Sequence, residues 1–240
     1  MKQRLVVIGN GMAGMRTVEE LLAIAPALYD IEVYSAEPHG NYNRILLSPV
    51  LAGDKSLAEI TLNDEAWYSD RGIVLHKGKT VVRIDRARRR VVVQDGSFTE
   101  YDRLLIATGS DPVMLPLPGA GLPGVVTFRD IADVEKMQLA AQAYRRAVVI
   151  GGGLLGLEAA YGLLQRGMAV TVVHLMDSLM ERQLDPVAAG MLRQSLEARN
   201  IAFCMPAETE AILGDERVRA VRLKDGTEIA ADLVVMAVGI

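Results

Sequence analysis

The sequence predicts an α/β protein built from two similar parallel-sheet units, on three observations. A short apolar run followed by a G-x-G-x-x-G pattern occurs twice, within residues 5–14 and 145–156. A helical pattern of apolar residues follows each glycine pattern. Each half then closes in the same register, because Gly96 precedes Gly109 by 13 positions and Gly226 precedes Gly239 by the same 13. The chain therefore reads as an internal duplication.

Each glycine pattern predicts a buried strand, a tight turn and a helix whose N-terminus faces a pyrophosphate. The first glycine allows the turn, the second leaves room for phosphate oxygens, and the third lets the helix pack closely on the strand. In chain order these are Gly9, Gly11 and Gly14, then Gly151, Gly153 and Gly156. Unpaired N–H groups and the helix dipole favour the anion. We expect two Rossmann-like, three-layer units that bind two nucleotides.

Composition narrows the classes of function. Half of the 240 residues are hydrophobic, so a globular protein is expected, and the net charge of −4 argues against nucleic acid as its main partner. The arginines between residues 83 and 90 are interpreted as the solvated end of a hairpin. No apolar run reaches the roughly 20 residues that span a bilayer. Three scattered histidines predict no metal site.

The single cysteine, Cys204, excludes an internal disulfide, a CxxC pair and a cysteine-bound iron–sulfur centre within these residues. It lies in an apolar, strand-like run, which predicts a structural thiol rather than a reactive one. A free thiol and the absence of an apolar signal segment fit a reducing cytoplasm.

In the first half, a helix is expected after the glycine pattern and is ended by Pro26. Residues 31–35 predict a strand, 81–85 and 90–94 a hairpin, and 104–109 a strand that ends in glycine. Glu37, just after the second strand, is either the acceptor of ribose hydroxyl groups or a solvated loop carboxylate. Arg44 is either a cation near a pyrophosphate or part of a surface turn, and Asn41 or Asn43 is the expected cap of a short helix.

In the second half, residues 111–124 hold four prolines and form the clearest linker. Asp130 or Asp133 is expected to open a helix that runs through Gln142. A helix after the second glycine pattern is expected to stop at Gly167. Asp185-Pro186 starts another, with Asn200 as its predicted end. We expect domains at residues 1–112 and 113–240.

The duplication resembles the two-dinucleotide flavoproteins of the glutathione-reductase type, in which the first unit binds FAD and the second NAD(P)H. Residues 41–53 (NYNRILLSPVLAG) and 170–185 (VTVVHLMDSLMERQLD) are similar to the N-terminal flavin module of assimilatory NAD(P)H nitrite reductase large subunits. Ferredoxin and rubredoxin reductases are close relatives. The resemblance covers the whole chain.

The resemblance assigns roles residue by residue. In the first unit it implies that FAD is contacted by Gly9, Gly11, Met12, Ala13, Gly14, Glu37, Arg44, Val81, Ala107, Thr108 and Gly109. In the second it implies that NAD(P)H is contacted by Gly151, Gly153, Leu154, Leu155, Gly156, His174, Arg182, Val238 and Gly239. Glu158 is expected near the nicotinamide and flavin, or is an ordinary glutamate of the first helical turn.

Three features depart from the family pattern. His174 stands where many relatives have an acidic residue, and Arg182 either meets a 2′-phosphate or is a surface charge, so NADH and NADPH stay open. Pro49 follows Ser48 where ferredoxin reductases often have lysine, which favours the nitrite-reductase type. The chain stops at Ile240, directly after Gly239, without the family's returning FAD segment, so the first unit is expected to be incomplete.

The resulting hypothesis is a module that passes hydride from NAD(P)H to FAD and electrons onward to a nitrite-reducing centre. Iron–sulfur and sirohaem are expected only outside this fragment, in missing chain or in a redox partner protein. The alternatives are a stand-alone NADH-dependent rubredoxin or ferredoxin reductase, and a non-catalytic nucleotide-binding fragment. The oligomeric state is left open, with a homodimer as one alternative.

Overall fold

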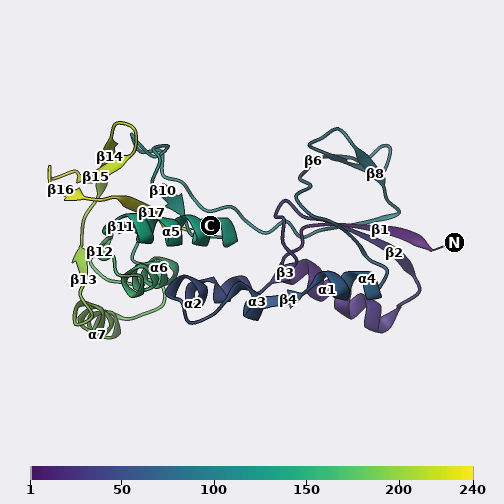
Figure 1. Cartoon of the computed structure of the whole chain (residues 1–240), viewed down its shortest axis with the longest axis horizontal. Helices are drawn as coiled ribbons and strands as arrows, with labels where there is room; N and C mark the ends of the chain where they lie inside the picture. The colour runs from purple at the N-terminus through teal and green to yellow at the C-terminus, as the bar shows by residue number, and fades with distance from the viewer. Residues whose placement is uncertain (1, 240) are drawn as a thin grey trace. The chain divides into compact units, whose positions relative to one another are not determined.

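The computed structural model describes residues 2–239, which cluster into two compact units (Figure 1). The first unit holds the residues up to Arg44 together with Leu57–Ser110. The second holds Ile45–Ser56 and the residues from Asp111 onward. The expected boundary between residues 112 and 113 therefore does not account for residues 45–56. This segment belongs to the second unit although it lies in the first half of the chain.

The first unit has a parallel sheet in the order β5-β2-β1-β9, an antiparallel sheet β6-β7-β8 and a small sheet β3-β4. Its strands are β1 (Gln3–Ile8), β2 (Tyr29–Tyr34), β3 (Asn41–Tyr42), β4 (Thr61–Asn63), β5 (Val74–His76), β6 (Val81–Asp85), β7 (Arg90–Val93), β8 (Phe98–Glu100) and β9 (Arg103–Ile106). Its helices are α1 (Met12–Ile24), α3 (Leu57–Ile60) and α4 (Glu65–Asp70). The predicted hairpin of residues 81–94 is β6-β7.

The side chains of β1 alternate between two faces, so the helices, the parallel sheet and the antiparallel sheet form three layers. Leu5 and Val7 pack with Met15 and Val18 of α1 in one buried cluster. Val6 and Ile8 pack on the other face, against Val91 and Val93 of β7. Because strand side chains alternate between faces, one apolar strand joins the helices to the antiparallel sheet.

The second unit repeats this plan with a parallel sheet in the order β10-β17-β11-β12-β13 and an antiparallel sheet β14-β15-β16. Its strands are β10 (Val125–Thr127), β11 (Arg146–Ile150), β12 (Ala169–Val173), β13 (Ile201–Cys204), β14 (Thr209–Gly214), β15 (Val218–Leu223), β16 (Glu228–Ala230) and β17 (Leu233–Met236). Its helices are α2 (Leu47–Ala52), α5 (Ile131–Ala143), α6 (Leu154–Gln165) and α7 (Pro186–Glu197), and the 3₁₀ turn η1 (Arg44–Leu46) leads into α2.

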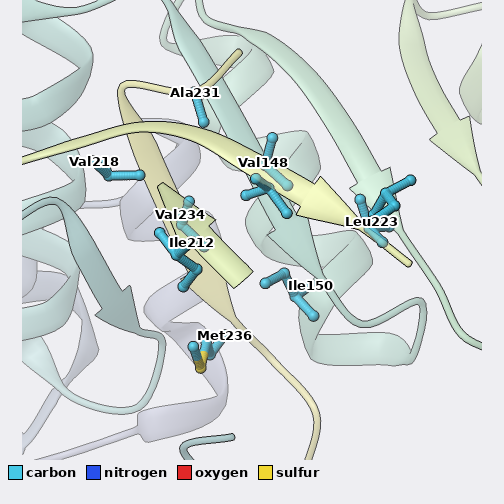
Figure 2. Close-up of a cluster of buried hydrophobic side chains, with 10 residues drawn as sticks. Val148, Ile150, Ile212, Val218, Leu223, Ala231, Val234 and Met236 are labelled. Carbon is cyan, nitrogen blue, oxygen red and sulfur yellow. The ribbon is translucent and has the colours of Figure 1, made fainter. Parts of the chain in front are cut away.

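The core of the second unit lies between its two sheets. Val148 and Ile150 of β11 and Val234 of β17 meet Ile212 of β14 and Leu223 of β15, all of them buried (Figure 2). The opposite face of β11 carries buried Ala147 and Val149. The two Rossmann-like, three-layer units expected from the sequence are confirmed as an architecture.

Helix α2 packs along one face of α6 within the second unit. The contacts fall on residues 158, 162 and 166, which are spaced by four and so share one helical face. Ser48 meets the first, the Leu51 side chain meets the second, and the C-terminal end of α2 meets the third. Gly162 provides the space, since a Cβ there would lie 2.8 Å from the Leu51 side chain. The guanidinium of Arg166 donates to the carbonyl oxygens of Leu51 at 2.7 Å and Val50 at 3.2 Å. The bond to Leu51 satisfies a carbonyl group that the helix end leaves unpaired, whereas the Val50 carbonyl oxygen also accepts from the N–H of Gly53 and from the side-chain amide of Gln138.

The predicted helix ends agree in part. Asp130 caps α5, with its side chain accepting from the N–H of Asp133, and Asp185 caps α7. Gly167, at φ +84°, follows α6 as expected. One expectation is wrong, because α7 ends at Glu197 rather than Asn200. Helix α2 has Leu46 at its own cap position without a side-chain bond, and Asn43 directly precedes η1, which leads into α2. Asn41 instead pairs in β3.

Matching aspartates hold the start of the glycine strand in each unit. Asp102 accepts from the backbone N–H of Arg4 at 2.7 Å. Asp232 accepts from the backbone N–H of Arg146 at 3.0 Å and from its guanidinium at 2.7 Å. The guanidinium and the backbone donors lower the pKa of the Asp232 carboxyl group from 3.8 to about 2. The matching positions of Asp102 and Asp232 in the sequence thus correspond to the same contact in both units, an aspartate that binds the backbone N–H at the start of the glycine strand.

We expect acid to remove the Asp232 contribution to stability. Because its pKa is lower in the folded chain than in the unfolded one, the carboxylate stabilises the fold above about pH 4, and the effect is lost as the pH falls through about 2. Allowing for solvent screening, the loss is about 1 to 2 kcal/mol. Urea unfolding of the wild type and Asp232→Asn at pH 7, 4 and 2.5 checks this: the difference between them should shrink with acid. A constant difference would contradict it.

Among residues 2–239, no helix has the length and apolar character needed to cross a membrane.

Candidate dinucleotide sites

In the first unit the glycine turn lies against the end of the last strand. Gly9 has φ +110°, and a Cβ there would lie 2.1 Å from the carbonyl oxygen of Ala107. A Cβ on Gly14 would lie 2.7 Å from the carbonyl oxygen of Gly9. The N–H of Ala107 donates to the carbonyl oxygen of Ile8 at 2.8 Å, which fixes the two strand ends together. Both glycines are required by the fold itself.

The second unit reproduces this geometry. Gly151 has φ +122°, and its Cβ would lie 2.3 Å from the carbonyl oxygen of Ala237. A Cβ on Gly156 would lie 2.1 Å from the carbonyl oxygen of Gly151. Ala237 was not among the predicted site residues, although its match to Ala107 in the duplicated register could have identified it.

The middle glycine of each pattern has a different reason to be glycine. Gly11 and Gly153 have ordinary φ angles of −82° and −81°, and a Cβ on either would have no atom of the chain within 4 Å. Each is the N-cap of a helix, whose first-turn N–H groups have no intrahelical acceptor. The first helical residues therefore present N–H groups at a site with open space. They are Met12 and Ala13 in the first unit, and Leu154 and Leu155 in the second. This arrangement suits a pyrophosphate.

Polar side chains behind the first loop hold it in place. The Tyr68 hydroxyl donates to Asn10 Oδ1 at 2.7 Å, and the Asn41 side-chain amide donates to the Asn10 carbonyl oxygen at 2.9 Å. Burial raises the pKa of the Tyr68 hydroxyl. No local sequence pattern reveals this support, because its members are 27 to 58 residues apart.

Glu37 and Arg44 come together in the first unit. Glu37 follows β2 by three residues, and its carboxylate accepts from the Tyr42 hydroxyl at 2.7 Å and from the Arg44 guanidinium. The carboxylate is thus fixed at the carboxyl end of the sheet, where a ribose is bound in this type of fold. Val81 lies on β6 and pairs with Val93. The roles predicted for these residues and for Thr108 and Gly109 stay predictions.

A cavity of about 850 Å³ in the second unit lies over the second glycine turn. Its volume is in the range of ligand and cofactor sites. It gathers the predicted residues that the sequence scatters, namely Gly151, Gly153, Leu154, Leu155, His174, Arg182, Val238 and Gly239. The Gly239 carbonyl oxygen accepts from the N–H of Val113 at 2.9 Å, which holds that wall.

His174 supports this turn from inside the protein. It is 8% exposed, and the N–H of Gly152 donates to its Nδ1 at 3.1 Å. A Cβ on Gly152 would lie 2.7 Å from the imidazole ring, so this glycine is needed for His174 rather than for a phosphate. The sequence offers no local signal for that contact.

Glu158 is held by a neighbouring helix. The Ser48 hydroxyl donates to its Oε2 at 2.6 Å, and both side chains are half-buried. Glu158 does not line the 850 Å³ cavity. Its predicted place near the nicotinamide stays a prediction.

Other titratable groups carry little of the chemistry. Burial raises the pKa of the half-buried Cys204 thiol, which ends β13. Within residues 2–239 no cluster of three or more acidic, histidine or cysteine side chains could hold a metal ion. A cavity of about 620 Å³ in the first unit lies at the start of β1, lined by Lys2, Arg4 and Asp102. That is the strand end opposite the glycine turn.

Comparison with known proteins gives the same outline. The family described as pyridine nucleotide-disulphide oxidoreductase matches residues 3–240. The chain is 52% identical over its whole length to nitrite reductase [NAD(P)H] of Bacillus subtilis and covers 30% of it. It is 46% identical to the assimilatory nitrate reductase electron transfer subunit of the same organism and covers 31% of it. It is 34% identical to rhodocoxin reductase of Rhodococcus erythropolis and covers 56% of it.

Solved structures share the fold. The chain superimposes on a covalent putidaredoxin reductase–putidaredoxin complex with a TM-score of 0.91 at 27% identity, covering 99% of this chain and 58% of that one. The NAD-dependent persulfide reductase of A. fulgidus gives a TM-score of 0.92 at 28% identity, covering 98% and 46%. This chain thus spans under two thirds of the length of each of these proteins.

Proposed function

Because the chain belongs to the pyridine nucleotide-disulphide oxidoreductase family, we propose that it is an electron-input module that takes hydride from NAD(P)H to FAD. The electrons then pass to a nitrite-reducing iron–sulfur and sirohaem centre outside these residues. The observation that carries the proposal is the pair of glycine turns with matching geometry, each with open space at its middle glycine. Two such turns in one chain suit two dinucleotides.

The residues present fit both cofactors. The turn at Gly11 with Glu37 would hold FAD, and the turn at Gly153 with its cavity would hold NAD(P)H. A bound flavin accepts a hydride from the nicotinamide and can release the electrons singly. The chain's own residues supply position: first-turn N–H groups for the phosphates, and the Ser48–Glu158 bond that fixes a carboxylate.

The onward acceptor lies outside this chain in the proposal. One cysteine cannot ligate an iron–sulfur cluster or form a redox disulfide, despite the family's name. Nitrite as the final substrate is supported by the 52% identity to the Bacillus subtilis nitrite reductase, and by Pro49, which follows Ser48 on α2. The lone thiol keeps the cytoplasm as the proposed location.

A second candidate is an NADH-dependent ferredoxin or rubredoxin reductase. It is supported by the 34% identity to rhodocoxin reductase over 98% of this chain and by the fold match to putidaredoxin reductase. Both candidates share the hydride step and differ in the electron acceptor.

An anaerobic absorption spectrum of the full-length natural protein tests the proposal. We expect flavin absorption that bleaches when NADH or NADPH is added and returns when nitrite is added, alongside iron–sulfur and sirohaem bands. Return only with an oxidised ferredoxin or rubredoxin would favour the second candidate. A colourless protein that still binds NADH would indicate a non-catalytic nucleotide-binding module and would overturn both.

A further inference from the structure

The loop that follows β12 is fastened to the second glycine turn. The N–H of Met180 donates to the carbonyl oxygen of Gly152 at 3.0 Å, and the N–H of Gly152 donates to His174 Nδ1 at 3.1 Å. Leu179, 1% exposed, packs beside the same glycine. Met180 has φ +51°, a conformation that surrounding contacts must impose on a non-glycine residue. The residue after Met180 therefore has a fixed position relative to the turn.

His174 uses both of its nitrogen atoms inside the protein. Because the N–H of Gly152 donates to Nδ1, the ring proton is on Nε2. Nε2 lies 3.1 Å from the carbonyl oxygen of Ser178 and 3.3 Å from Glu181 Oε2. His174 is therefore a positioning residue: it stands at the end of the strand, where a ribose-binding acid is usual, but it has no nitrogen left for a nucleotide.

Glu181 has the properties that His174 lacks. Its side chain lines the 850 Å³ cavity and is 35% exposed, with Oε2 beside His174. Its Oε1 has no hydrogen-bond or ion-pair partner within residues 2–239. The first unit offers a parallel in Glu37, a carboxylate also fixed by neighbouring side chains after the second strand.

We propose that Glu181, held by His174, is the acceptor for the adenosine ribose hydroxyl groups, and that it makes the second unit select NADH over NADPH. This inference rests on the proposed function, since it assumes that the cavity holds a pyridine dinucleotide. A carboxylate accepts hydrogen bonds from both hydroxyl groups of a ribose. The 2′-phosphate of NADPH would place about two more negative charges next to the Glu181 carboxylate, which would repel them.

The neighbouring Arg182 would favour NADPH over NADH, but only weakly. It also lines the cavity, but it is exposed and its guanidinium has no partner among the described residues that would hold it near a phosphate. An exposed, unsupported side chain loses conformational freedom when it forms an ion pair, so such pairs contribute little. We therefore expect the anchored carboxylate to outweigh Arg182 in setting the preference.

Dissociation constants of NADH and NADPH for the purified full chain, measured by titration calorimetry, test the inference. We expect the wild type to bind NADH about tenfold more tightly than NADPH. In Glu181→Gln, NADH affinity should fall about tenfold, as expected for the loss of a charged acceptor, while NADPH affinity should hold or rise. Glu210→Gln is the matched control: it removes the same charge from a residue that pairs with Arg222 outside the cavity, and should leave the ratio unchanged.

Three further variants separate the outcomes. His174→Leu should lower the NADH-to-NADPH ratio, and adding Glu181→Gln to it should lower the ratio no further, a non-additivity that a purely structural role would not give. A ratio that responds to Arg182→Ala but not to Glu181→Gln would overturn the inference and leave the proposed function intact. A wild type that binds neither dinucleotide would instead overturn the proposed function.

Discussion

Replacement of Gly151 by alanine is expected to lower the free energy of unfolding by about 2 to 6 kcal/mol. Two costs add at this position. At φ +122° an alanine is strained whatever the space around it, and its Cβ would lie 2.3 Å from the carbonyl oxygen of Ala237. That oxygen is backbone at the end of a central strand, so it cannot rotate away as a side chain could. Urea unfolding followed by circular dichroism measures the loss.

Gly167→Ala separates the two costs. Gly167 has φ +84°, but a Cβ there would meet nothing within 4 Å. We therefore expect it to lose only about 1 to 2 kcal/mol from backbone strain. If Gly151→Ala destabilises the protein no more than Gly167→Ala does, the close approach to Ala237 is not what requires glycine at the turn.

The middle glycines should give the reverse result, with the fold kept and binding lost. Gly153→Ala has an allowed φ of −81° and open space, so the free energy of unfolding should change by less than about 1 kcal/mol. The methyl group would occupy the space through which a phosphate reaches the N–H groups of the first turn. Loss of one or two such charge-assisted bonds should weaken NADH binding about tenfold to a hundredfold. Calorimetric titration with NADH measures it.

The duplication supplies the matched control. Gly11→Ala makes the same change in the first unit and should reduce flavin content while NADH affinity stays at the wild-type value. Flavin is quantified by absorbance after release from the full-length protein. If both variants affect both ligands equally, or if neither affects binding, the assignment of one dinucleotide to each turn is wrong.

Much of the fold could be predicted because its signals are local. A glycine pattern between an apolar strand and a helix involves about 25 consecutive residues, and its duplicated register also located Asp102 and Asp232. The caps at Asp130 and Asp185 follow from contacts only three residues apart. Such interactions join residues that are close in the sequence, so sequence patterns can predict them.

The rest depends on contacts between distant residues. The need for glycine at position 152 arises from the His174 ring, 22 residues away, and Asn10 is held by Tyr68, 58 residues away. The place of Glu181 follows from Met180 bonding back to Gly152. The packing of α2 depends on Arg166, 115 residues from Leu51. No spacing rule connects such pairs, which meet only once the sheets and helices have packed.

The position of α2 has a consequence for the exchange of modules between relatives. The second unit is discontinuous in sequence, because residues 45–56 leave the first unit and return to it. A chimaera joined at residue 111 would keep the recipient's α2 and pair it with the donor's α6. Leu51 would then have to fit whatever residue replaced Gly162, and its carbonyl group would need a substitute for the Arg166 guanidinium. If the second unit binds NAD(P)H as proposed, transferring its coenzyme preference therefore requires two grafted segments, residues 45–56 together with the residues from 111 onward.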